Sequence, residues 1–339
     1  MKYRKYGNTG TFSSALAFGA MTFGEGNRWK LGGLSQETSD KMVKECFDQG
    51  INIYDTADVY DDGESEQILG KSLAPYRDQV MIATKVRGRM GKGINETGLS
   101  RHHMSVAINK SLERLGTDRI DIYQYHGWDF AGNIDEILNT MEMFVQQGKV
   151  IYPGISNFSA WQIALFQTAT KERGYAPYES AQMNYSLLNR DVEQEVLPFL
   201  KYSGMTLLSW SPLHGGILTG KYSRDERPKE GTRMGDRGIY FPYFDEGRGW
   251  DVVEELKEVA QEQGSKPSQV ALSWLVEKGA VPIIGARTLE QLRENLESMN
   301  VVLTKEQIGR LDKVSGQREM YPGWMLKRQN GDRTFERME

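Results

Sequence analysis

The sequence has little of several residue patterns, and each shortage excludes a class of protein. It has one cysteine in 339 residues, Cys46, which rules out an internal disulfide and any zinc site built from cysteines. This cysteine lies among apolar residues at helical spacing (Met42, Val43 and Phe47), so we interpret it as a core residue rather than a reactive thiol. The four histidines show no HExxH or HxH spacing, and we therefore predict no metal site.

The sequence also lacks an excess of one charge and a long apolar run. Lys and Arg number 42 against 46 Asp and Glu, which leaves a formal net charge of −4. This balance argues against a nucleic-acid or polybasic membrane partner, because both need clustered positive charge. No run approaches the roughly 18 apolar residues of a membrane span, and the opening MKYRKYGNTG has no apolar signal-peptide core. We therefore expect a cytoplasmic protein with no nucleic-acid or membrane partner.

What the sequence does contain is an alternation of two kinds of segment. Eight short apolar runs are typical of buried strands: residues 15–19, 51–55, 80–85, 120–126, 150–155, 180–183, 206–211 and 281–285. Between them lie amphipathic stretches of helical period, such as the one that Ser35 would cap and Gly50 would end. This pattern predicts an α/β fold, a closed (β/α)₈ TIM barrel with long loops at its carboxyl-terminal rim. A doubly wound open sheet is the alternative, but no strand is followed by GxGxxG.

Three of the predicted strands have an ionisable side chain at their carboxyl-terminal end. In a barrel of this kind, catalytic residues lie at that end of the strands. The second strand ends at Asp55, the third at Lys85 and the fourth at His126. Tyr60 follows Asp55 by five residues in the adjoining loop. Each could singly be a helix cap, a solvated charge or a packed side chain. Together they predict one cavity, because a lysine that closes an apolar strand needs a buried partner, and Asp55 supplies one.

A phenol beside an ammonium can perform acid–base chemistry. A free tyrosine has a pKa of about 10 and is a poor acid at neutral pH, but a neighbouring ammonium stabilises the phenolate and lowers that pKa. Lys85 would supply this charge, so Tyr60 would donate a proton to a carbonyl oxygen while His126 donates a hydrogen bond to it. With no metal site and no activated Ser or Cys, this arrangement needs an external source of hydride.

These residues resemble those of the aldo-keto reductase superfamily, in particular its branch of aryl-alcohol dehydrogenases and potassium-channel β subunits. The resemblance covers almost the whole chain, and its most specific segments are DTADVY at 55–60, GESE at 63–66, TK at 84–85, SLERLG at 111–116 and DIYQYH at 121–126. It implies a catalytic tetrad of Asp55, Tyr60, Lys85 and His126, all four of which are present. It also implies an NADP-dependent oxidoreductase that reduces aldehydes or ketones to alcohols reversibly.

The resemblance further implies where NADPH or NADP⁺ would bind. Ser156, Asn157 and Gln182 resemble the residues that hold the nicotinamide carboxamide, and Trp210 stands where the family places an aromatic ring on the nicotinamide face. Arg287, at a helix start, suits the 2′-phosphate, which favours NADPH over NADH; an exposed arginine in an ordinary turn is the alternative. The predicted cofactor residues are Gly19, Met21, Asp55, Ser156, Asn157, Gln182, Trp210, Ser211, Pro212, Leu213, Gly215, Gly220, Lys221, Gly285, Arg287, Gln291 and Asn295.

The substrate side departs from the family pattern. His126 is followed by Gly-Trp where many relatives have Trp-Pro, and residues 214–250 form a long insertion that we expect to shape the pocket. The segment at 321–325 resembles one in the aryl-alcohol dehydrogenase branch, whose tail can close over the substrate. We expect one barrel domain over 1–339, with a rim loop at 214–250 and a tail at 316–339. Predicted substrate residues are Met21, Tyr60, His126, Trp128 and Trp324.

An aryl aldehyde is the substrate favoured by the aromatic residues Trp128, Trp324, Tyr240, Phe241, Tyr243 and Phe244. Such side chains would also stack on a sugar ring or a polycyclic ketone. The other class of function is an NADPH-binding regulatory module, because potassium-channel β subunits resemble the same family. Those subunits differ at the tetrad histidine, whereas His126 is present here, and we see no long N-terminal extension that could act on a channel. We therefore predict an enzyme with a small-molecule carbonyl or alcohol substrate. The sequence carries no indication of an oligomeric state.

Overall fold

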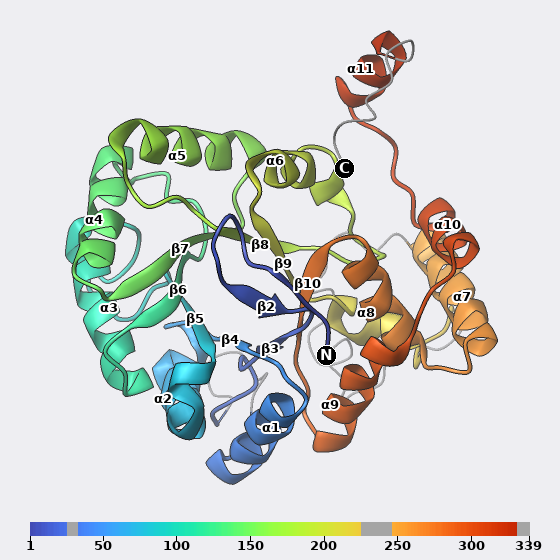
Figure 1. Ribbon diagram of the computed structural model, residues 1–339, viewed down its shortest axis with the longest axis horizontal. Helices are drawn as coiled ribbons and strands as arrows, with labels where there is room; N and C mark the ends of the chain where they lie inside the picture. Colours follow the sequence, from blue (N-terminus) through green and yellow to red (C-terminus); the bar gives the residue numbers. More distant parts are fainter. Residues whose placement is uncertain (26–32, 225–245, 331–339) are drawn as a thin grey trace.

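The computed structural model describes residues 1–25, 33–224 and 246–330. The chain begins with an antiparallel hairpin of β1 (Tyr3–Lys5) and β2 (Phe12–Ser14), which lies across one end of the barrel (Figure 1). Our sequence analysis did not predict this hairpin, because three residues are too few to show a period. It is fastened to the barrel by the buried Tyr6, whose phenol donates to Ser180 Oγ at 2.8 Å.

Eight parallel strands close into a barrel in the order β10-β3-β4-β5-β6-β7-β8-β9. They are β3 (Ala17–Gly19), β4 (Ile53–Asp55), β5 (Met81–Val86), β6 (Ile120–Tyr125), β7 (Val150–Ser156), β8 (Ser180–Asn184), β9 (Thr206–Trp210) and β10 (Ala280–Ile284). Each strand overlaps one of the eight predicted runs, so the predicted (β/α)₈ TIM barrel is confirmed.

Helices surround the barrel (Figure 1). Their bounds are α1 (Gln36–Asp48), α2 (Glu64–Leu73), α3 (Arg101–Leu115), α4 (Ile134–Gln146), α5 (Ala160–Arg173), α6 (Val196–Ser203), α7 (Glu246–Glu262), α8 (Pro267–Glu277), α9 (Leu289–Leu296), α10 (Lys305–Val314) and α11 (Gly323–Gln329). Short 3₁₀ turns are η1 (Tyr60–Gly63), η2 (Ala74–Gln79), η3 (Asp191–Glu193), η4 (His214–Thr219) and η5 (Glu297–Asn300). As predicted, Ser35 caps α1 by accepting from the backbone N–H of Thr38.

Strand alternation determines which side chains enter the barrel. Ile53 on β4, Ala83 on β5 and Ile122 on β6 belong to one small apolar cluster inside the barrel. Successive residues of a strand point to opposite faces, so the residues two positions further along each strand point inward as well. On all three strands that next inward residue is polar, and it lies one layer nearer the carboxyl-terminal rim. The barrel interior therefore has a layer of polar side chains, Asp55, Lys85 and Gln124, above a layer of apolar ones.

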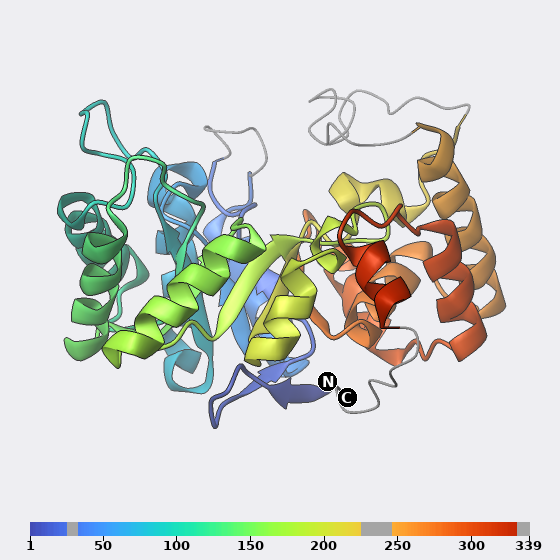
Figure 2. The ribbon, with the colours of Figure 1, turned by 90° about the horizontal axis from the view of Figure 1, so that it is seen from above.

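The loops that follow the carboxyl ends of the strands gather on the side opposite the hairpin, at the top of Figure 2. The predicted rim loop at 214–250 begins with η4 and runs into α7, and its residues 225–245 lie outside the described part. The predicted tail contains α11, which projects beyond the ring of helices in Figure 1, and residues 331–339 are again outside the described part. The domain boundaries thus remain predictions. No described helix is long and apolar enough to cross a membrane.

Candidate active site

Lys85 is the centre of the polar layer inside the barrel. Its ammonium is fully buried and donates to Asp55 Oδ1 at 2.6 Å, to the carbonyl oxygen of Thr56 at 2.7 Å and to the phenol oxygen of Tyr60 at 3.3 Å. All three partners come from β4 and the turn that follows it, one strand away from Lys85 in the barrel. The sequence predicted the ion pair with Asp55, and the structure forms it.

Asp55 is held from its other side by two amides. Its Oδ2 accepts from Gln182 Nε2 at 2.7 Å and from Gln124 Nε2 at 3.2 Å. The carboxylate is therefore fixed by donors from β5, β6 and β8. A fixed carboxylate fixes the ammonium that it binds, and through it the Tyr60 oxygen. Gln124 was not among our predicted site residues, although it lies two positions before His126 on the inward face of β6.

The environment keeps Lys85 charged. Burial by itself would lower the pKa of this ammonium, but the adjacent Asp55 carboxylate and the Tyr60 oxygen outweigh it, so its pKa is raised. Lys85 is therefore a permanent cation at any pH near neutrality. A buried cation with a phenol oxygen at 3.3 Å stabilises the ionised form of that phenol.

His126 has the opposite electrostatic situation. Burial, together with the positive charges of Lys85 and Arg87, lowers the pKa of this imidazole to about 3. The ring is therefore neutral at neutral pH, with one N–H to donate. It meets the Tyr60 ring edge-on, with 5.8 Å between ring centroids. A phenol and a neutral imidazole thus stand side by side at the mouth of the barrel.

These groups lie at one side of a cavity of about 1020 Å³, a volume at the upper end for sites that bind small molecules. Most of the predicted site residues line it: Gly19, Met21, Asp55, Tyr60, His126, Ser156, Asn157, Gln182, Trp210, Ser211, Pro212, Leu213, Gly215, Lys221, Gly285, Arg287, Gln291 and Asn295. Lys85 lies behind Asp55 and Tyr60, fully buried. The structure therefore brings together the catalytic and cofactor sets that the sequence predicted as separate motifs.

Besides Lys85, three of the predicted site residues are not among the lining residues. Trp128 turns away from the cavity, and its ring packs at 5.2 Å from that of Phe158 and at 5.6 Å from that of Trp161. Trp324 is 43 % exposed on α11 and has the ring of Tyr321 as a neighbour. Gly220 ends η4 beside the lining residue Lys221. The cavity thus gives no support to the predicted substrate roles of the two tryptophans, so these roles stay predictions.

The family model described as "Aldo/keto reductase family" matches residues 15–315 of the chain. The chain belongs to the aldo/keto reductase family. It is 34 % identical over 327 residues to "Uncharacterized oxidoreductase YrpG" of Bacillus subtilis, covering 93 % of this chain and 96 % of that protein. It is 31 % identical to "Versiconal hemiacetal acetate reductase" of Aspergillus parasiticus, over 95 % of this chain and 99 % of that one. It is also 31 % identical to "Probable aryl-alcohol dehydrogenase AAD4" of Saccharomyces cerevisiae, over 84 % and 89 %.

The predicted resemblance is thereby confirmed, and the chain is an oxidoreductase of a family that generally uses a nicotinamide cofactor. The carboxamide corner of the cavity has donors and acceptors for such a group. Asn157, at a φ of 57°, donates through Nδ2 to the carbonyl oxygen of His126 at 3.0 Å and accepts from Trp210 Nε1 at 2.9 Å. Ser156 Oγ lies 3.0 Å from the same Nδ2. This network links the end of β7 to His126, which directly follows β6, and to Trp210 on β9.

The opposite side of the cavity, formed by the loops after β9 and β10, suits phosphate groups. Arg287 directly precedes Thr288, the N-cap of α9, so a guanidinium and a helix N-terminus lie together. Lys221 lines the same side, near Gly216. At Gly19, a Cβ would lie 2.8 Å from Ile283 Cγ2, so the absence of a side chain keeps this wall open. Volume, amide donors and cations therefore fit a nicotinamide dinucleotide.

Several lining residues were missed by the sequence analysis: Thr22, Val59, Arg87, Gly88, Arg89, Lys266, Ile283, Ile284 and Glu294. Arg87 carried a usable signal, because it lies two positions beyond Lys85 and so continues the inward face of β5. Lys266 and Glu294 could not be found this way, since they come from α8 and α9 and meet as an ion pair at 2.6 Å only in the fold.

A second buried polar cluster lies behind the tetrad. Glu66 accepts from Thr84 Oγ1 and from Arg114 Nε, both at 2.6 Å. The neighbouring Asp58 is fully buried, and burial raises its pKa to about 8, with Glu66 adding to the rise and Arg114 opposing it. Asp58 is therefore protonated at neutral pH. Among the described residues, no group of three or more His, Cys, Asp or Glu is arranged to hold a metal ion.

Proposed function

We propose that this aldo/keto reductase is an NADPH-dependent enzyme that reduces aldehydes or ketones to alcohols, reversibly, with Tyr60 as the proton donor. The observation that carries this proposal is the Lys85 ammonium, which contacts both the Asp55 carboxylate at 2.6 Å and the Tyr60 phenol oxygen at 3.3 Å beside the cavity. The proposed tetrad is Asp55, Tyr60, Lys85 and His126. A bound reduced nicotinamide would supply the hydride that a carbonyl carbon accepts.

In the proposed mechanism, the chain's own residues handle the carbonyl oxygen. As negative charge develops on that oxygen, Tyr60 transfers its phenolic proton to it. The phenolate that remains lies next to the Lys85 ammonium, which offsets its charge without any rearrangement. Asp55 keeps the ammonium in place and is itself held by Gln182 and Gln124. In alcohol oxidation the same phenolate takes the hydroxyl proton back.

His126 would position the substrate rather than protonate it. Its low pKa, about 3, makes it a neutral hydrogen-bond donor at working pH. A neutral donor orients the carbonyl oxygen toward Tyr60 and stabilises the charge that develops on it. Because the positive charges of Lys85 and Arg87 already face this ring, an imidazolium would be strongly disfavoured there.

The proposed preference for NADPH over NADH rests on the β9 and β10 side of the cavity. Arg287 offers a forked guanidinium beside the N-terminus of α9, which matches the geometry of a phosphate dianion. Gln291 accepts from the Arg287 backbone N–H at 3.0 Å, and Asn295 donates to the Gly285 carbonyl oxygen at 3.3 Å. These two contacts fix the turn that would hold the 2′-phosphate and adenine.

For the substrate, we propose an aryl aldehyde or the corresponding alcohol as the first class to test. The names of two relatives support this choice, since both are called aryl-alcohol dehydrogenases of Saccharomyces cerevisiae, one probable and one putative. A keto-sugar is the second class, because polar side chains share the lining with Met21 and Val59. We also propose a cytoplasmic location, since the single buried cysteine suits a reducing compartment.

The deciding experiment is an NADPH-oxidation screen over aryl aldehydes, aliphatic aldehydes, ketones and sugars. The proposal predicts sustained turnover with at least one class, with one alcohol formed for each NADPH oxidised. Tight NADPH binding without turnover on any member of the panel would contradict it and favour the regulatory, NADPH-binding module instead.

A further inference from the structure

The reacting side of the cavity carries a positive charge that the tetrad does not use. Arg87 follows Lys85 by two residues and lines the same cavity as Tyr60 and His126. Its guanidinium makes one polar contact among the described residues, from Nε to the carbonyl oxygen of Trp128 at 3.2 Å. None of the ion pairs in the described part of the chain includes Arg87. Its two terminal nitrogens therefore have no acidic partner there.

Arg87 is held in place by the elements that carry the reacting groups. Its backbone adopts a φ of 129°, which side-chain-bearing residues rarely adopt, and its carbonyl oxygen is fixed by Gly98 N at 2.9 Å. The next residue, Gly88, packs so tightly that a Cβ would lie 1.8 Å from Val59 Cγ1. The loop after β5 is thus seated against the turn that leads into Tyr60. On its other side, the Nε contact ties Arg87 to the segment that follows His126.

The charges of the cavity are unevenly neutralised. Among the described lining residues, the acidic side chains are Asp55 and Glu294, and each already pairs with a lysine, Lys85 and Lys266 respectively. Cations on the β9 and β10 side would face the phosphates of the cofactor under the proposed function. On the β4 to β6 side two arginines line the cavity, Arg87 and Arg89, and no part of that cofactor accounts for them. Of the two, Arg87 is the one whose charge helps to depress the pKa of His126.

From this geometry we infer that Arg87 is a specificity residue for an anionic carbonyl substrate, one that bears a carboxylate or a phosphate in addition to its aldehyde or ketone. The forked terminal nitrogens of an arginine match a carboxylate or phosphate through two parallel hydrogen bonds. The substrate would then be held at two points, with its carbonyl oxygen at Tyr60 and His126 and its anion at Arg87. This inference rests on the proposed reductase function, because it names the substrate class of the same site.

The test compares anionic benzaldehydes with neutral benzaldehydes of related structure. The carboxylate arm uses 2-, 3- and 4-carboxybenzaldehyde, each against its methyl ester, and the phosphate arm uses 4-formylphenyl phosphate against 4-methoxybenzaldehyde. For the wild-type protein with NADPH, we expect the kcat/KM of at least one anionic member to exceed that of its neutral partner by about 10-fold or more. The position of the carboxylate that gives the largest ratio reports the spacing between Arg87 and the reacting oxygen.

Variants of Arg87 then assign the preference. Arg87→Gln should abolish most of this ratio, mainly by raising KM for the anionic member, while Arg87→Lys should retain part of it, because a lysine keeps the charge without the fork. Lys92→Gln is the matched control, since Lys92 is an exposed cation of the same loop that does not line the cavity. It should leave the ratio unchanged.

The outcomes separate this inference from the proposed function. Equal kcat/KM for charged and neutral members, or a preference that survives in Arg87→Gln, would overturn the role of Arg87 and leave the reductase standing. Absence of turnover on every member would instead contradict the reductase. In that case calorimetric titration with 4-(hydroxymethyl)benzoate and with benzyl alcohol still tests the anion site. The inference expects tighter binding of the anion by the wild type, lost in Arg87→Gln; indifference to the variant would refute it.

Discussion

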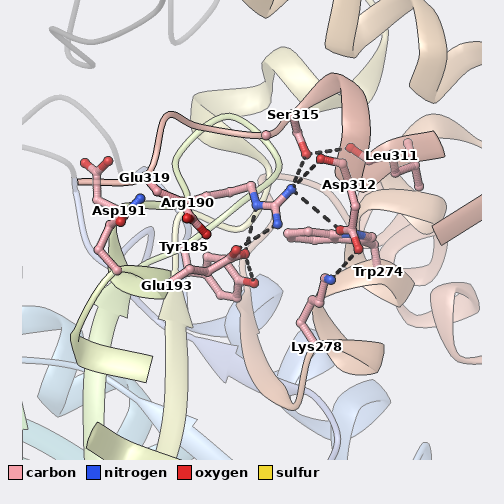
Figure 3. A network of polar contacts seen from close by, with 12 residues as sticks. Tyr185, Arg190, Asp191, Glu193, Trp274, Lys278, Leu311, Asp312, Ser315 and Glu319 are labelled. Carbon is pink, nitrogen blue, oxygen red and sulfur yellow. Dashed lines mark hydrogen bonds and ion pairs between the residues drawn. The ribbon is translucent and has the colours of Figure 1, made fainter. Parts of the chain in front are cut away.

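Two buried cations in this protein have similar surroundings but different consequences. Lys85 lies inside the barrel and is paired with the carboxylate of Asp55. Arg190 lies where the loop after β8 meets α8 and α10, and it is paired with the carboxylate of Glu193 (Figure 3). Arg190 donates through Nε and Nη2 to the two oxygens of Glu193, at 2.8 and 2.7 Å. Its Nη1 donates to the Asp312 carbonyl oxygen at 2.9 Å and to Ser315 Oγ at 2.8 Å.

The groups around Arg190 are satisfied by one another. Glu193 also accepts from the Tyr185 phenol at 2.6 Å, and Asp312 accepts from Trp274 Nε1 at 3.0 Å and from Lys278 Nζ at 2.6 Å. The chain of contacts joins residues that are more than 120 positions apart in sequence, such as Arg190 and Ser315. None of these residues lines the cavity. We interpret this network as a fastening of the carboxyl-terminal helices to the barrel.

The two networks differ in whether their outermost group reaches the cavity. The Lys85 network ends on a phenol at the wall of a cavity, beside a neutral imidazole, whereas the Arg190 network ends on other protein groups. An ion pair that closes on itself contributes to stability and specificity of packing. One that ends at a cavity leaves a polarised group available for a substrate. The same electrostatics therefore predicts a loss of catalysis in one region and a loss of stability in the other.

The largest expected effect is on turnover, from Lys85→Met. Removing the ammonium leaves the Tyr60 phenolate unstabilised, so kcat should fall by about 10² to 10⁴-fold. The measurement is NADPH oxidation with a preferred aldehyde, at a temperature where circular dichroism shows the variant folded. If the folded variant had a kcat within a factor of two of the wild type, Lys85 would have no role in the proposed mechanism.

The counterpart in the other region is Arg190→Met. It leaves Glu193 without its guanidinium partner, and we expect the free energy of unfolding to fall by about 3 kcal/mol, measured by urea denaturation. The kcat of the folded variant should not change. Arg173→Met is the matched control, because Arg173 pairs with the largely exposed Asp135, and such surface pairs contribute at most about 1 kcal/mol. Equal losses in the two variants would contradict the fastening role.

A third prediction concerns pH and the buried Asp58. Its folded pKa of about 8 exceeds the ordinary aspartate value of about 4, so the folded state holds a proton that the unfolded chain releases between these pH values. Stability contributed by this proton is present below pH 4 and is lost as pH rises toward 8, by at most about 1.4 kcal/mol per unit. Asp58→Asn removes this dependence, so its stability relative to wild type should increase from pH 5 to pH 8. A constant difference would show that Asp58 is ionised in the fold.

The smallest effect sharpens the comparison within the cavity. Arg287→Ala should raise the Kd for NADPH by about 10-fold and leave the Kd for NADH unchanged, because only NADPH carries the 2′-phosphate. Both constants can be measured by quenching of tryptophan fluorescence. Equal weakening of the two cofactors would place Arg287 elsewhere than on the 2′-phosphate, and no weakening of either would remove it from the site.

Strand alternation explains why much of this could be predicted from the sequence. Asp55 ends β4, Lys85 is the last residue but one of β5, and His126 directly follows β6, so their convergence at one rim follows once the barrel is recognised. Counting two residues forward from Lys85 would have identified Arg87 as a site residue. Counting two residues back from His126 would have identified Gln124. Trp128 breaks the pattern because the chain turns after His126, and its ring joins the aromatic cluster under α5 instead.

Other features depend on contacts that no local pattern encodes. The Arg190 network joins a 3₁₀ turn to two distant helices, so neither its partners nor its burial could be read from the residues around it. The raised pKa of Asp58 likewise arises from burial beside Glu66, which only the packed barrel produces. Side chains on regular strands were thus predictable, as were Tyr60 and Arg287 from their place in motifs, whereas polar contacts made by helix packing were not.

The central claim is that Tyr60, set next to the Lys85 ammonium, donates the proton. It is tested most directly by NADPH-dependent carbonyl reduction in Tyr60→Phe, with NADPH affinity and melting temperature measured on the same samples. The account predicts that kcat falls by about 10² to 10⁴-fold while NADPH still binds with wild-type affinity. A variant that keeps most of the wild-type turnover with every aldehyde tested would contradict it.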